Sequence, residues 1–328
     1  MQDSERITNF AIAKAKWFHV RVVRYRSAKP FTPVRVWLEP LKATPSMEIG
    51  GVVLLFGPML TSFVRRGPNR LKMKTIVIIP ARYGSSRLPG KPLAKICGEE
   101  LILHVCRNVS QTGLDFAVAT DHDEIFRCVE RAGYRAVMTA ASHKSGTERV
   151  AEAYRLLRIK SDIIVNVQGD EPFVKPEEII GVSAALENNP HAGIATVATR
   201  FDNAEGIAQL ADPNLVKIVM TPGMEAIYFS RNVIPYDREG FESGIMSNVE
   251  YYTHVGIYAY RPETLTRIVG MPATPLEKAE KLEQLRWIEN GCRIAVALTA
   301  RPSLGIDTAE DLMRAEEKMQ KLVGAQTR

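Results

Sequence analysis

The stretch Thr75–Leu93, TIVIIPARYGSSRLPGKPL, decides the fold. Its first five residues form a continuous β-branched run, which is typical of a strand buried on both faces of a parallel sheet. A basic loop containing two glycines follows directly, at the point where this strand would end. Because open α/β sheets bind ligands beyond the carboxyl ends of their parallel strands, we expect a binding site in this loop.

Outward from this stretch, short apolar runs alternate with amphipathic stretches, as βαβ units do. Further strands are expected at Phe116–Ala119, Ala136–Met138, Ile163–Val167, Ile194–Ala198, Val216–Met220, Ala226–Phe229, Thr253–Tyr260 and Arg293–Ala297. Helices are expected at Leu101–Ser110, Asp123–Ala132, Thr147–Leu157, Pro176–Glu187, Leu276–Glu289 and Thr308–Leu322. The pattern predicts one α/β domain with a mixed, mostly parallel, Rossmann-like sheet, helices on both faces and a small hairpin-like insertion.

The composition is that of an ordinary globular protein. Of 328 residues, 45% are apolar and 24% are charged, which argues against disordered, collagen-like and disulfide-dense classes. The four cysteines, Cys97, Cys106, Cys128 and Cys292, form neither a CxxC pair nor a zinc-type cluster with histidine. They indicate reduced thiols and a cytoplasmic location.

The net charge of +6 is concentrated at the amino terminus. Residues 1–72 hold 13 Lys and Arg against 4 Asp and Glu, whereas the whole chain holds 43 against 37. Residues 73–328 therefore hold 30 basic against 33 acidic residues, a net charge of −3. The main body of the chain is mildly acidic, so its charge does not predict binding to nucleic acid.

We expect residues 1–72 to be a basic extension outside a domain formed by residues 73–328. Within the extension, Ile49–Val64 is apolar for 16 residues and is followed by two arginines, as membrane segments are. A spanning helix needs about 20 residues, and two glycines and Pro58 lower the helix propensity here. A disordered leader or an unused upstream start is the preferred interpretation. Membrane association would depend on this extension alone.

The loop after the first strand carries three cations, Arg82, Arg87 and Lys91. Arginine forks bind pairs of phosphate oxygens and lysine supplies a mobile point charge, so the loop suits a triphosphate. It is not a Walker A loop, because Lys91 is followed by Pro92, and it lacks GxGxxG. A solvated basic loop would explain any two of these cations. The full set favours a phosphate site.

Two aspartates lie beside expected elements. Asp170 follows the strand Ile163–Val167, and Asp307 precedes the last helix. Together with triphosphate oxygens they suit Mg²⁺, which prefers octahedral oxygen ligands and usually takes one or two from the protein. Taken alone, Asp307 is better explained as a helix cap. Taken with Asp170, it is expected to bind metal.

Seven motifs recur in the order in which one known family has them. They are IPARYGSSRLPGKPL at 79–93, HKSGTER at 143–149, NVQGDEP at 166–172, YFSRNVIP at 228–235, HVGIYAYR at 254–261, LEQLR at 282–286 and GIDTAEDL at 305–312. Together they resemble the 3-deoxy-manno-octulosonate cytidylyltransferases, or CMP-Kdo synthetases. The resemblance begins at Met73 and leaves the first 72 residues unmatched. It implies a homodimeric α/β nucleotidyltransferase that transfers CMP from CTP to Kdo for lipopolysaccharide synthesis.

The resemblance also implies roles for single residues, with Mg²⁺ as the cofactor. Metal binding is assigned to Asp170 and Asp307, and charge stabilisation to Arg82 and Lys91. The nucleotide is assigned to Pro80, Ala81, Arg82, Lys91, Ser145, Gly146, Thr147 and Arg149. The sugar is assigned to Arg87, Gln168, His254, Tyr258, Glu283 and Gln284, partly beside the insertion that would also form the dimer. Alternatively, Ser145 or Thr147 is a helix cap and His254 is a packed core histidine.

The expected reaction is an in-line attack by the anomeric hydroxyl of Kdo on the α-phosphorus of CTP, with pyrophosphate leaving. It needs no protein nucleophile, and neither a general base nor the number of Mg²⁺ ions follows from the sequence. The nearest alternative is a cytidylyltransferase for sialic acid or for an amino analogue of Kdo. A metal-dependent glycosyltransferase is disfavoured because it normally presents a DxD pair, and an inactive nucleotide-binding regulator because every expected charged position is filled.

Overall fold

The computed structural model describes residues 46–49, 52–55, 71–84, 88–238, 249–300 and 305–326. The chain divides into two compact units, Met1–Arg70 and Leu71–Arg328. In the first, β1 (Ser46–Ile49) pairs antiparallel with β2 (Val52–Leu55). The described part of the apolar run 49–64 is therefore strand rather than helix, and the rest of the run lies outside the described residues. Within the described residues, no helix has the length and apolar character needed to span a bilayer.

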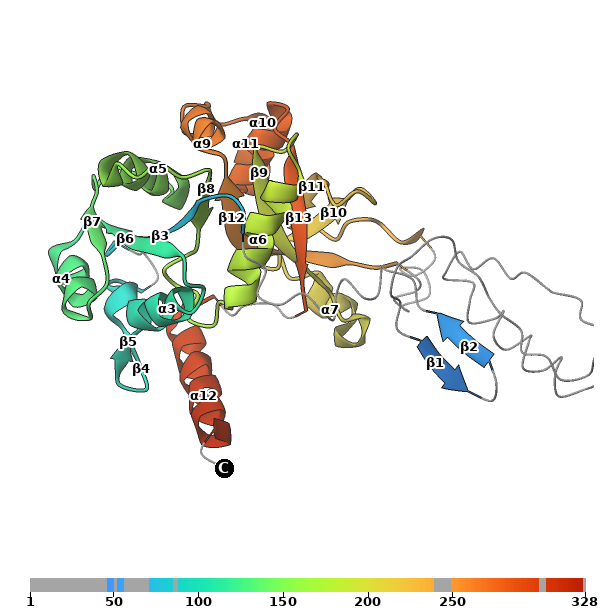
Figure 1. Cartoon of the computed structure of the whole chain (residues 1–328), viewed down its shortest axis with the longest axis horizontal. Coiled ribbons are helices and arrows are strands. Elements are labelled where there is room, and N and C mark those ends of the chain that lie inside the picture. Colours follow the sequence, from blue (N-terminus) through green and yellow to red (C-terminus); the bar gives the residue numbers. More distant parts are fainter. Residues whose placement is uncertain are drawn as a thin grey trace, which may run out of the picture. The chain divides into compact units, whose positions relative to one another are not determined.

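The second unit is built on one mixed sheet centred on β3 (Thr75–Ala81), shown in Figure 1. All seven residues of β3 are buried, as the continuous β-branched run predicts. On its two sides β3 pairs in parallel with β6 (Asp115–Thr120) and β8 (Ile163–Asn166). Beyond β6, β7 (Ala136–Met138) continues the parallel arrangement. The carboxyl ends of these strands therefore share one edge, where a ligand site is expected.

The remaining strands form the other half of the sheet. The long strand β12 (Tyr252–Tyr260) is antiparallel to β8 and also to β9 (Ile194–Arg200). β13 (Ile294–Thr299) then pairs in parallel with β9. From β12 the sheet continues into the antiparallel pair β10 (Lys217–Met220) and β11 (Ala226–Ser230). The strand order is β11-β10-β12-β8-β3-β6-β7, with β9 and β13 branching from β12, which confirms a mixed sheet.

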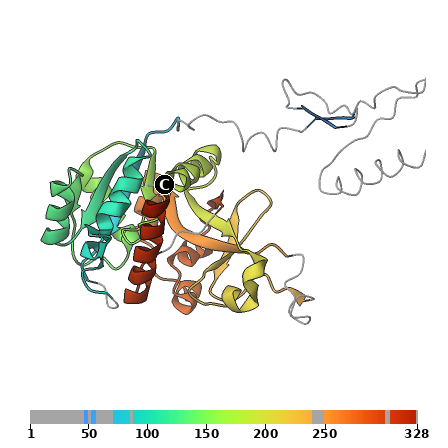
Figure 2. The ribbon, with the colours of Figure 1, turned by 90° about the horizontal axis from the view of Figure 1, so that it is seen from below.

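Helices cover both faces of this sheet. They are α3 (Leu101–Ser110), α4 (Asp123–Arg131), α5 (Gly146–Leu157), α6 (Pro176–Asn188), α7 (Gly206–Leu210), α9 (Pro262–Val269), α10 (Pro275–Glu280), α11 (Glu283–Glu289) and α12 (Ala309–Gln326). In Figure 1, α5 and α3 lie on opposite sides of β3 and β6, and Figure 2 shows the same unit from below.

Successive residues of β3 enter two different cores, because side chains alternate across a strand. Val77 and Ile79 pack in the core that contains apolar residues of α3, α4 and α6. Ile76 and Ile78 pack in the core that contains residues of α5, α9 and α11. A third, smaller core consists of Phe201, Leu210 and Tyr251, beside α7 and the start of β12. Two packed faces confirm the predicted layer arrangement, whereas the role of the insertion in dimerisation stays a prediction.

The single helix expected over Leu276–Glu289 is wrong. Two helices occupy this range, α10 and α11, because Lys281 adopts a left-handed conformation with φ of 54° and ends the first of them. Leu282 then has an extended backbone and precedes α11, so Glu283 is the first residue of a new helix. The sequence carries no glycine or asparagine here to mark the break. In contrast, α9 was not expected although Pro262, at its first turn, is an ordinary start signal.

Candidate active site

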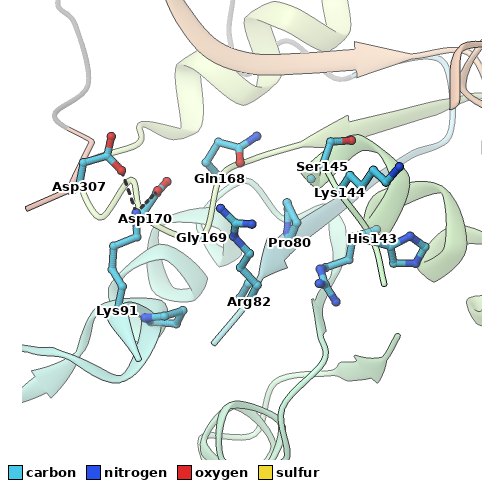
Figure 3. Close-up of a pocket in the computed structure, with 14 residues that line it drawn as sticks. Pro80, Arg82, Lys91, His143, Lys144, Ser145, Gln168, Gly169, Asp170 and Asp307 are labelled. Atoms are coloured by element: carbon cyan, nitrogen blue, oxygen red, sulfur yellow. Dashed lines mark hydrogen bonds and ion pairs between the residues drawn. The ribbon is translucent and has the colours of Figure 1, made fainter. Parts of the chain in front are cut away.

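A cavity of about 280 Å³ lies at the carboxyl ends of β3 and β8 (Figure 3). The sequence-predicted residues that line it are Pro80, Ala81, Arg82, Lys91, Ser145, Gly146, Arg149, Gln168, Asp170 and Asp307. Four further lining residues were not predicted, namely Pro92, His143, Lys144 and Gly169. The three motifs at 79–93, 143–149 and 166–172 therefore meet with the turn at Asp307 in one place.

Gly169 allows the two central loops to approach each other. Its backbone N–H donates to the carbonyl of Pro80 at 3.3 Å. A Cβ atom at position 169 would lie 2.8 Å from that same carbonyl oxygen, which is too close for any other residue. The loop after β8 is thus pressed against the end of β3, and this contact brings Asp170 to the phosphate loop.

Lys91 joins the two predicted metal ligands. It follows Gly90, whose φ of 68° turns the chain into a short 3₁₀ helix, η2 (Lys91–Leu93), and its side chain is largely buried. The Lys91 Nζ donates to Asp170 Oδ2 at 2.5 Å and to Asp307 Oδ1 at 3.1 Å, as Figure 3 shows. It also donates to the carbonyl of Ile306 at 2.7 Å. One ammonium therefore compensates two carboxylates that come from distant parts of the chain.

The helix-cap interpretation of Asp307 is wrong. The Asp311 carboxylate accepts from the backbone N–H groups of Asp307 and Thr308 at 3.1 and 2.9 Å. Thr308 Oγ1 in turn accepts from the backbone N–H of Asp311 at 3.1 Å. Thr308 and Asp311 thus cap the start of α12 by accepting each other's backbone N–H groups. The Asp307 side chain accepts from Lys91 instead.

Asp170 and Asp307 suit a divalent metal. Both carboxylates have an oxygen within 3.1 Å of Lys91 Nζ, so the two acids lie close together and share this ammonium as their counter-ion. Two hard oxygen donors match what Mg²⁺ takes from a protein when water and substrate phosphates complete its shell. In the described part of the chain, no cluster of three or more His, Cys, Asp or Glu could hold a metal. The donor set therefore fits a metal that is shared with a phosphate substrate.

The arginines of the pocket differ in their partners. Arg149 is only 3% exposed, and its guanidinium donates to Asp121 Oδ2 at 2.7 Å and to Thr139 Oγ1 at 2.6 Å. The Arg82 guanidinium is exposed and pairs with no acid among the described residues. Arg87, also expected here, lies outside the described residues. Arg82 and the exposed Lys144 can therefore meet a bound anion directly, whereas the charge of Arg149 is already compensated.

The segment 143–149 is tied to α11. Ser145 caps α5, since its Oγ accepts from the backbone N–H of Glu148 at 3.2 Å. The same hydroxyl donates to Glu283 Oε1 at 3.1 Å, and Thr147 Oγ1 donates to Glu283 Oε2 at 2.6 Å. Burial raises the pKa of Glu283, while the bond from Thr147 and the charge of Arg286 oppose that rise. Ser145 thus serves as the predicted cap and lines the pocket, whereas Thr147 is buried beside it.

His143 holds the start of the same segment. Its Nε2 lies 2.5 Å from Glu152 Oε2 on α5. The Glu152 carboxylate also accepts from the backbone N–H of Ala140 at 2.8 Å. These two hydrogen bonds, that from Ala140 being the stronger influence, lower the pKa of Glu152. Glu152 of α5 therefore holds the loop that precedes this helix, through Ala140 and His143.

The predicted sugar residues divide into two groups. Gln168 lines the cavity, and its Nε2 donates to Asn166 Oδ1 at 3.2 Å. His254, Tyr258, Glu283 and Gln284 do not line it. Gln284 is 5% exposed and Tyr258 packs in the core with α5, α9 and α11. The structure thus brings one described residue of this set to the cavity and places four behind it.

His254 lies on β12, and its side chain is half-buried. Thr196 Oγ1 donates to the carbonyl of Ile257 at 2.9 Å and lies 2.9 Å from His254 Nε2. Since the hydroxyl has one proton, the imidazole donates from Nε2 to Thr196. Burial lowers the pKa of His254 to about 3, so the ring is neutral. The hydrogen bond to Thr196 agrees with the packing alternative, and contact of His254 with the sugar stays a prediction.

Comparison with known proteins identifies the family. Residues 76–294 match the family model of the cytidylyltransferases. A 3-deoxy-manno-octulosonate cytidylyltransferase from Phocaeicola vulgatus is 43% identical over 252 residues, which cover 77% of this chain and 100% of the relative. This chain belongs to the 3-deoxy-manno-octulosonate cytidylyltransferase family. A family member from Idiomarina loihiensis is 46% identical over 251 residues, covering 75% of this chain and 98% of its own.

Solved structures agree with this family. A CMP:2-keto-3-deoxy-manno-octonic acid synthetase complexed with CTP is 37% identical, with a TM-score of 0.69, and covers 76% of this chain and 99% of its own. A putative glucose-1-phosphate thymidylyltransferase from Bacillus anthracis, 15% identical with a TM-score of 0.52, shares the fold. The chain is thus a nucleotidyltransferase with a mixed α/β fold, which confirms both predictions.

Five residues with a part in this site were missed by the sequence analysis, namely Pro92, Asp121, His143, Lys144 and Gly169. His143 and Lys144 lie in the quoted motif 143–149, and Gly169 in 166–172. Asp121 directly follows β6, so its place at the carboxyl end of a parallel strand was a usable signal. What the sequence lacked was any sign of its partner, Arg149.

Proposed function

We propose that the chain transfers CMP from CTP to Kdo and releases pyrophosphate. The observation that carries this proposal is the meeting of Lys91, Asp170 and Asp307 beside the exposed Arg82 at the strand ends. Two carboxylates and several cations suit a metal-bound triphosphate. The names of the relatives and the CTP in the solved neighbour support both substrates.

The base and ribose of CTP are assigned to one end of the cavity. The backbone of Pro80 and Ala81 would face them together with Ser145, Gly146 and the largely buried Arg149. Thr147 does not line the cavity, so it would act by holding Glu283 rather than by contact. Backbone groups can distinguish cytosine from uracil because the 4-amino and 4-oxo groups reverse the hydrogen bond that they require. In Figure 3, Ser145 and His143 lie at the opposite end of the cavity from Asp307, and the triphosphate would lie between them.

Asp170 and Asp307 would hold Mg²⁺. When bound, the metal supplies positive charge to the phosphate oxygens. Lys91, which already touches both carboxylates, and Arg82 would offset the charge that develops on the leaving pyrophosphate. The anomeric oxygen of Kdo forms the new bond to the α-phosphorus as the bond to pyrophosphate breaks. The chain's part is therefore to orient the two substrates and compensate charge, with no covalent intermediate.

The sugar site stays a proposal in all its residues. Gln168 is the described member that lines the cavity, and Arg87 would supply a cation for the Kdo carboxylate. Four residues of the set do not line the cavity, namely His254, Tyr258, Glu283 and Gln284. Direct contact with the sugar would require that the side of the site formed by β12 and α11 opens. Otherwise these residues would act indirectly, through the groups that they hold. Glu283 fits the second role, because its oxygens hold Ser145 and Thr147.

The wider setting is part of the same proposal. Residues 73–328 would be the catalytic domain, active as a homodimer in the cytoplasm and supplying CMP-Kdo for lipopolysaccharide synthesis. Residues 1–72 would be a basic extension outside the catalytic fold. No nucleic acid would take part, and any contact with a membrane would be made by the extension.

Sugar specificity is the test of this proposal against its nearest alternative. The protein is incubated with CTP, Mg²⁺ and either Kdo, its amino analogue or sialic acid, and products are identified by mass spectrometry. We expect CMP-Kdo to form with the highest kcat/KM. A higher kcat/KM with either of the other sugars would identify that sugar, and not Kdo, as the preferred substrate.

A further inference from the structure

Asp121 links two segments of the site that come from different strands. It is the first residue after β6, and its side chain is 14% exposed. Its Oδ2 accepts from Arg149 Nη2 at 2.7 Å, and its Oδ1 accepts from the backbone N–H of Tyr83 at 3.3 Å. One carboxylate thus holds both the start of the phosphate loop and the arginine of α5.

The neighbouring residue strengthens the first of these links. The ring of His122 stacks on the ring of Tyr83, with centroids 3.9 Å apart and planes 16° from parallel. The carbonyl of Tyr83 accepts from the backbone N–H of Gly90 at 3.0 Å. The position of Tyr83 therefore influences where the side chains of two pocket cations lie, because Arg82 precedes Tyr83 and Lys91 follows Gly90.

The second link concerns the arginine. The Arg149 Nη1 donates to Thr139 Oγ1 and, at 3.4 Å, to the carbonyl of Ala140. The guanidinium is thus enclosed by residues after β6 and β7, and Asp121 supplies its one negative partner among the described residues. A buried cation without its partner is unfavourable, so the loops would rearrange if Asp121 lost its charge.

We propose that Asp121 is a positioning residue for nucleotide binding. It acts through Arg149 and Tyr83, and so fixes the cavity wall and the cation of Arg82 where the nucleotide enters. This inference rests on the proposed function for the identity of the ligand, CTP. It predicts that loss of the carboxylate weakens binding of CTP and leaves Kdo unaffected.

The test is Asp121→Asn, with Asp123→Asn as the matched control. Asp123 lies two residues further on and is exposed, so Asp123→Asn removes the same charge at a residue that does not line the cavity. Binding of CTP is measured by calorimetry without Kdo, and KM values for both substrates by pyrophosphate release. For Asp121→Asn we expect the Kd and KM for CTP to rise about tenfold, as loss of a charge-assisted hydrogen bond implies. The KM for Kdo should stay within about twofold, and Asp123→Asn should match the wild type.

Other results would overturn the proposal. A lower melting temperature with an unchanged Kd for CTP would leave Asp121 a purely structural role. A raised KM for Kdo alone would show that Asp121 supports binding of the sugar and not of the nucleotide. If Asp121→Asn does not fold, Asp121→Glu keeps the charge but moves the oxygens, and a normal CTP affinity in that variant would equally contradict a positioning role.

A double substitution tests the route. If Asp121 acts partly through Arg149, adding Asp121→Asn to Arg149→Met should weaken CTP binding by less than the product of the two single effects. Independent effects would refute that route. If the wild-type protein binds CTP but releases no pyrophosphate with Kdo, the proposed function is refuted. The CTP affinities of the variants would still decide the role of Asp121.

Discussion

The two sides of the site differ in how their residues are used. On the side of the parallel strands, Arg82, Lys91 and Asp170 stand on loops after β3 and β8 and line the cavity. On the side of β12 and α11, His254 and Gln284 stand within regular elements, where Gln284 is buried and His254 is half-buried. Residues on loops at strand ends are free to meet a ligand, whereas residues within elements first satisfy the fold.

The difference also separates charge from packing. The loop side holds a lysine between two carboxylates, an arrangement that a metal and a triphosphate can take over. The opposite side holds a neutral histidine bonded to Thr196 and the buried acid Glu283, whose oxygens are bonded to Ser145 and Thr147. Substitutions on the loop side should therefore change turnover, and those on the other side should change sugar binding or stability.

The largest effect is expected for Asp170→Asn and Asp307→Asn. Each removes the charge of a carboxylate that is proposed to bind the metal and keeps its shape, so kcat should fall roughly 100-fold or more while the melting temperature stays close to that of the wild type. Glu310→Gln is the matched control, because Glu310 is an exposed acid of α12 that does not line the cavity, and this variant should keep its kcat. Near wild-type rates for either variant at limiting Mg²⁺ would show that its carboxylate is not a ligand.

Next in size is Arg82→Ala, together with Lys91→Ala. Loss of either cation should lower kcat/KM about 10- to 100-fold, since each would offset charge in the transition state. Steady-state kinetics with both substrates varied measures this. The exposed Lys95→Ala, four residues beyond Lys91, serves as the control for loss of a positive charge. An effect of equal size in Lys95→Ala would mean that the overall charge, and not the pocket, matters.

A smaller effect is expected for Gln284→Ala on the opposite side. Removing one neutral hydrogen-bonding group should raise the KM for Kdo about three- to tenfold and spare the KM for CTP. Gln168→Ala, at a residue that lines the cavity, provides the comparison within the same assay. A raised KM for CTP with Kdo unaffected would overturn the division of the site into a nucleotide side and a sugar side.

The last prediction concerns stability rather than activity, through His254. Its pKa is lowered to about 3 in the folded protein, so between that value and its ordinary pKa of 6.5 the unfolded chain binds the additional proton. Stability therefore falls with falling pH, by about 1.6 kcal/mol from pH 6.5 to pH 5, because the slope rises from about half to nearly all of 1.4 kcal/mol per pH unit. Urea unfolding at the two pH values should show a weaker dependence in His254→Gln. The exposed His191→Gln should keep the wild-type slope, and a matching slope in His254→Gln would contradict a neutral buried ring.

Much of the fold followed from local patterns. The run Thr75–Ile79 predicted a buried strand, and the basic loop after it lies at the cavity as expected. Local patterns do not report partners far away in the chain, however. Lys91 meets Asp170 and Asp307 across 79 and 216 residues, and Arg149 meets Asp121 across 28. The left-handed turn at Lys281 was equally invisible, because lysine carries no preference for it.

The side of the site behind the cavity was harder to predict for a related reason. The motifs that contain His254 and Glu283 identify the family, but a motif does not state whether a side chain contacts the ligand or holds a residue that does. His254 is enclosed by β9 and β12, and Glu283 bridges α11 and α5. Only the packing of these elements reveals such indirect roles.

The most direct measurement of the proposed reaction is pyrophosphate release from each of CTP, UTP, ATP and GTP in the presence of Kdo and Mg²⁺. We expect release with CTP, and none above background with the other three when Asp170→Asn serves as the blank. Release that does not depend on Kdo, or that is faster with another nucleotide than with CTP, would contradict CMP transfer to Kdo.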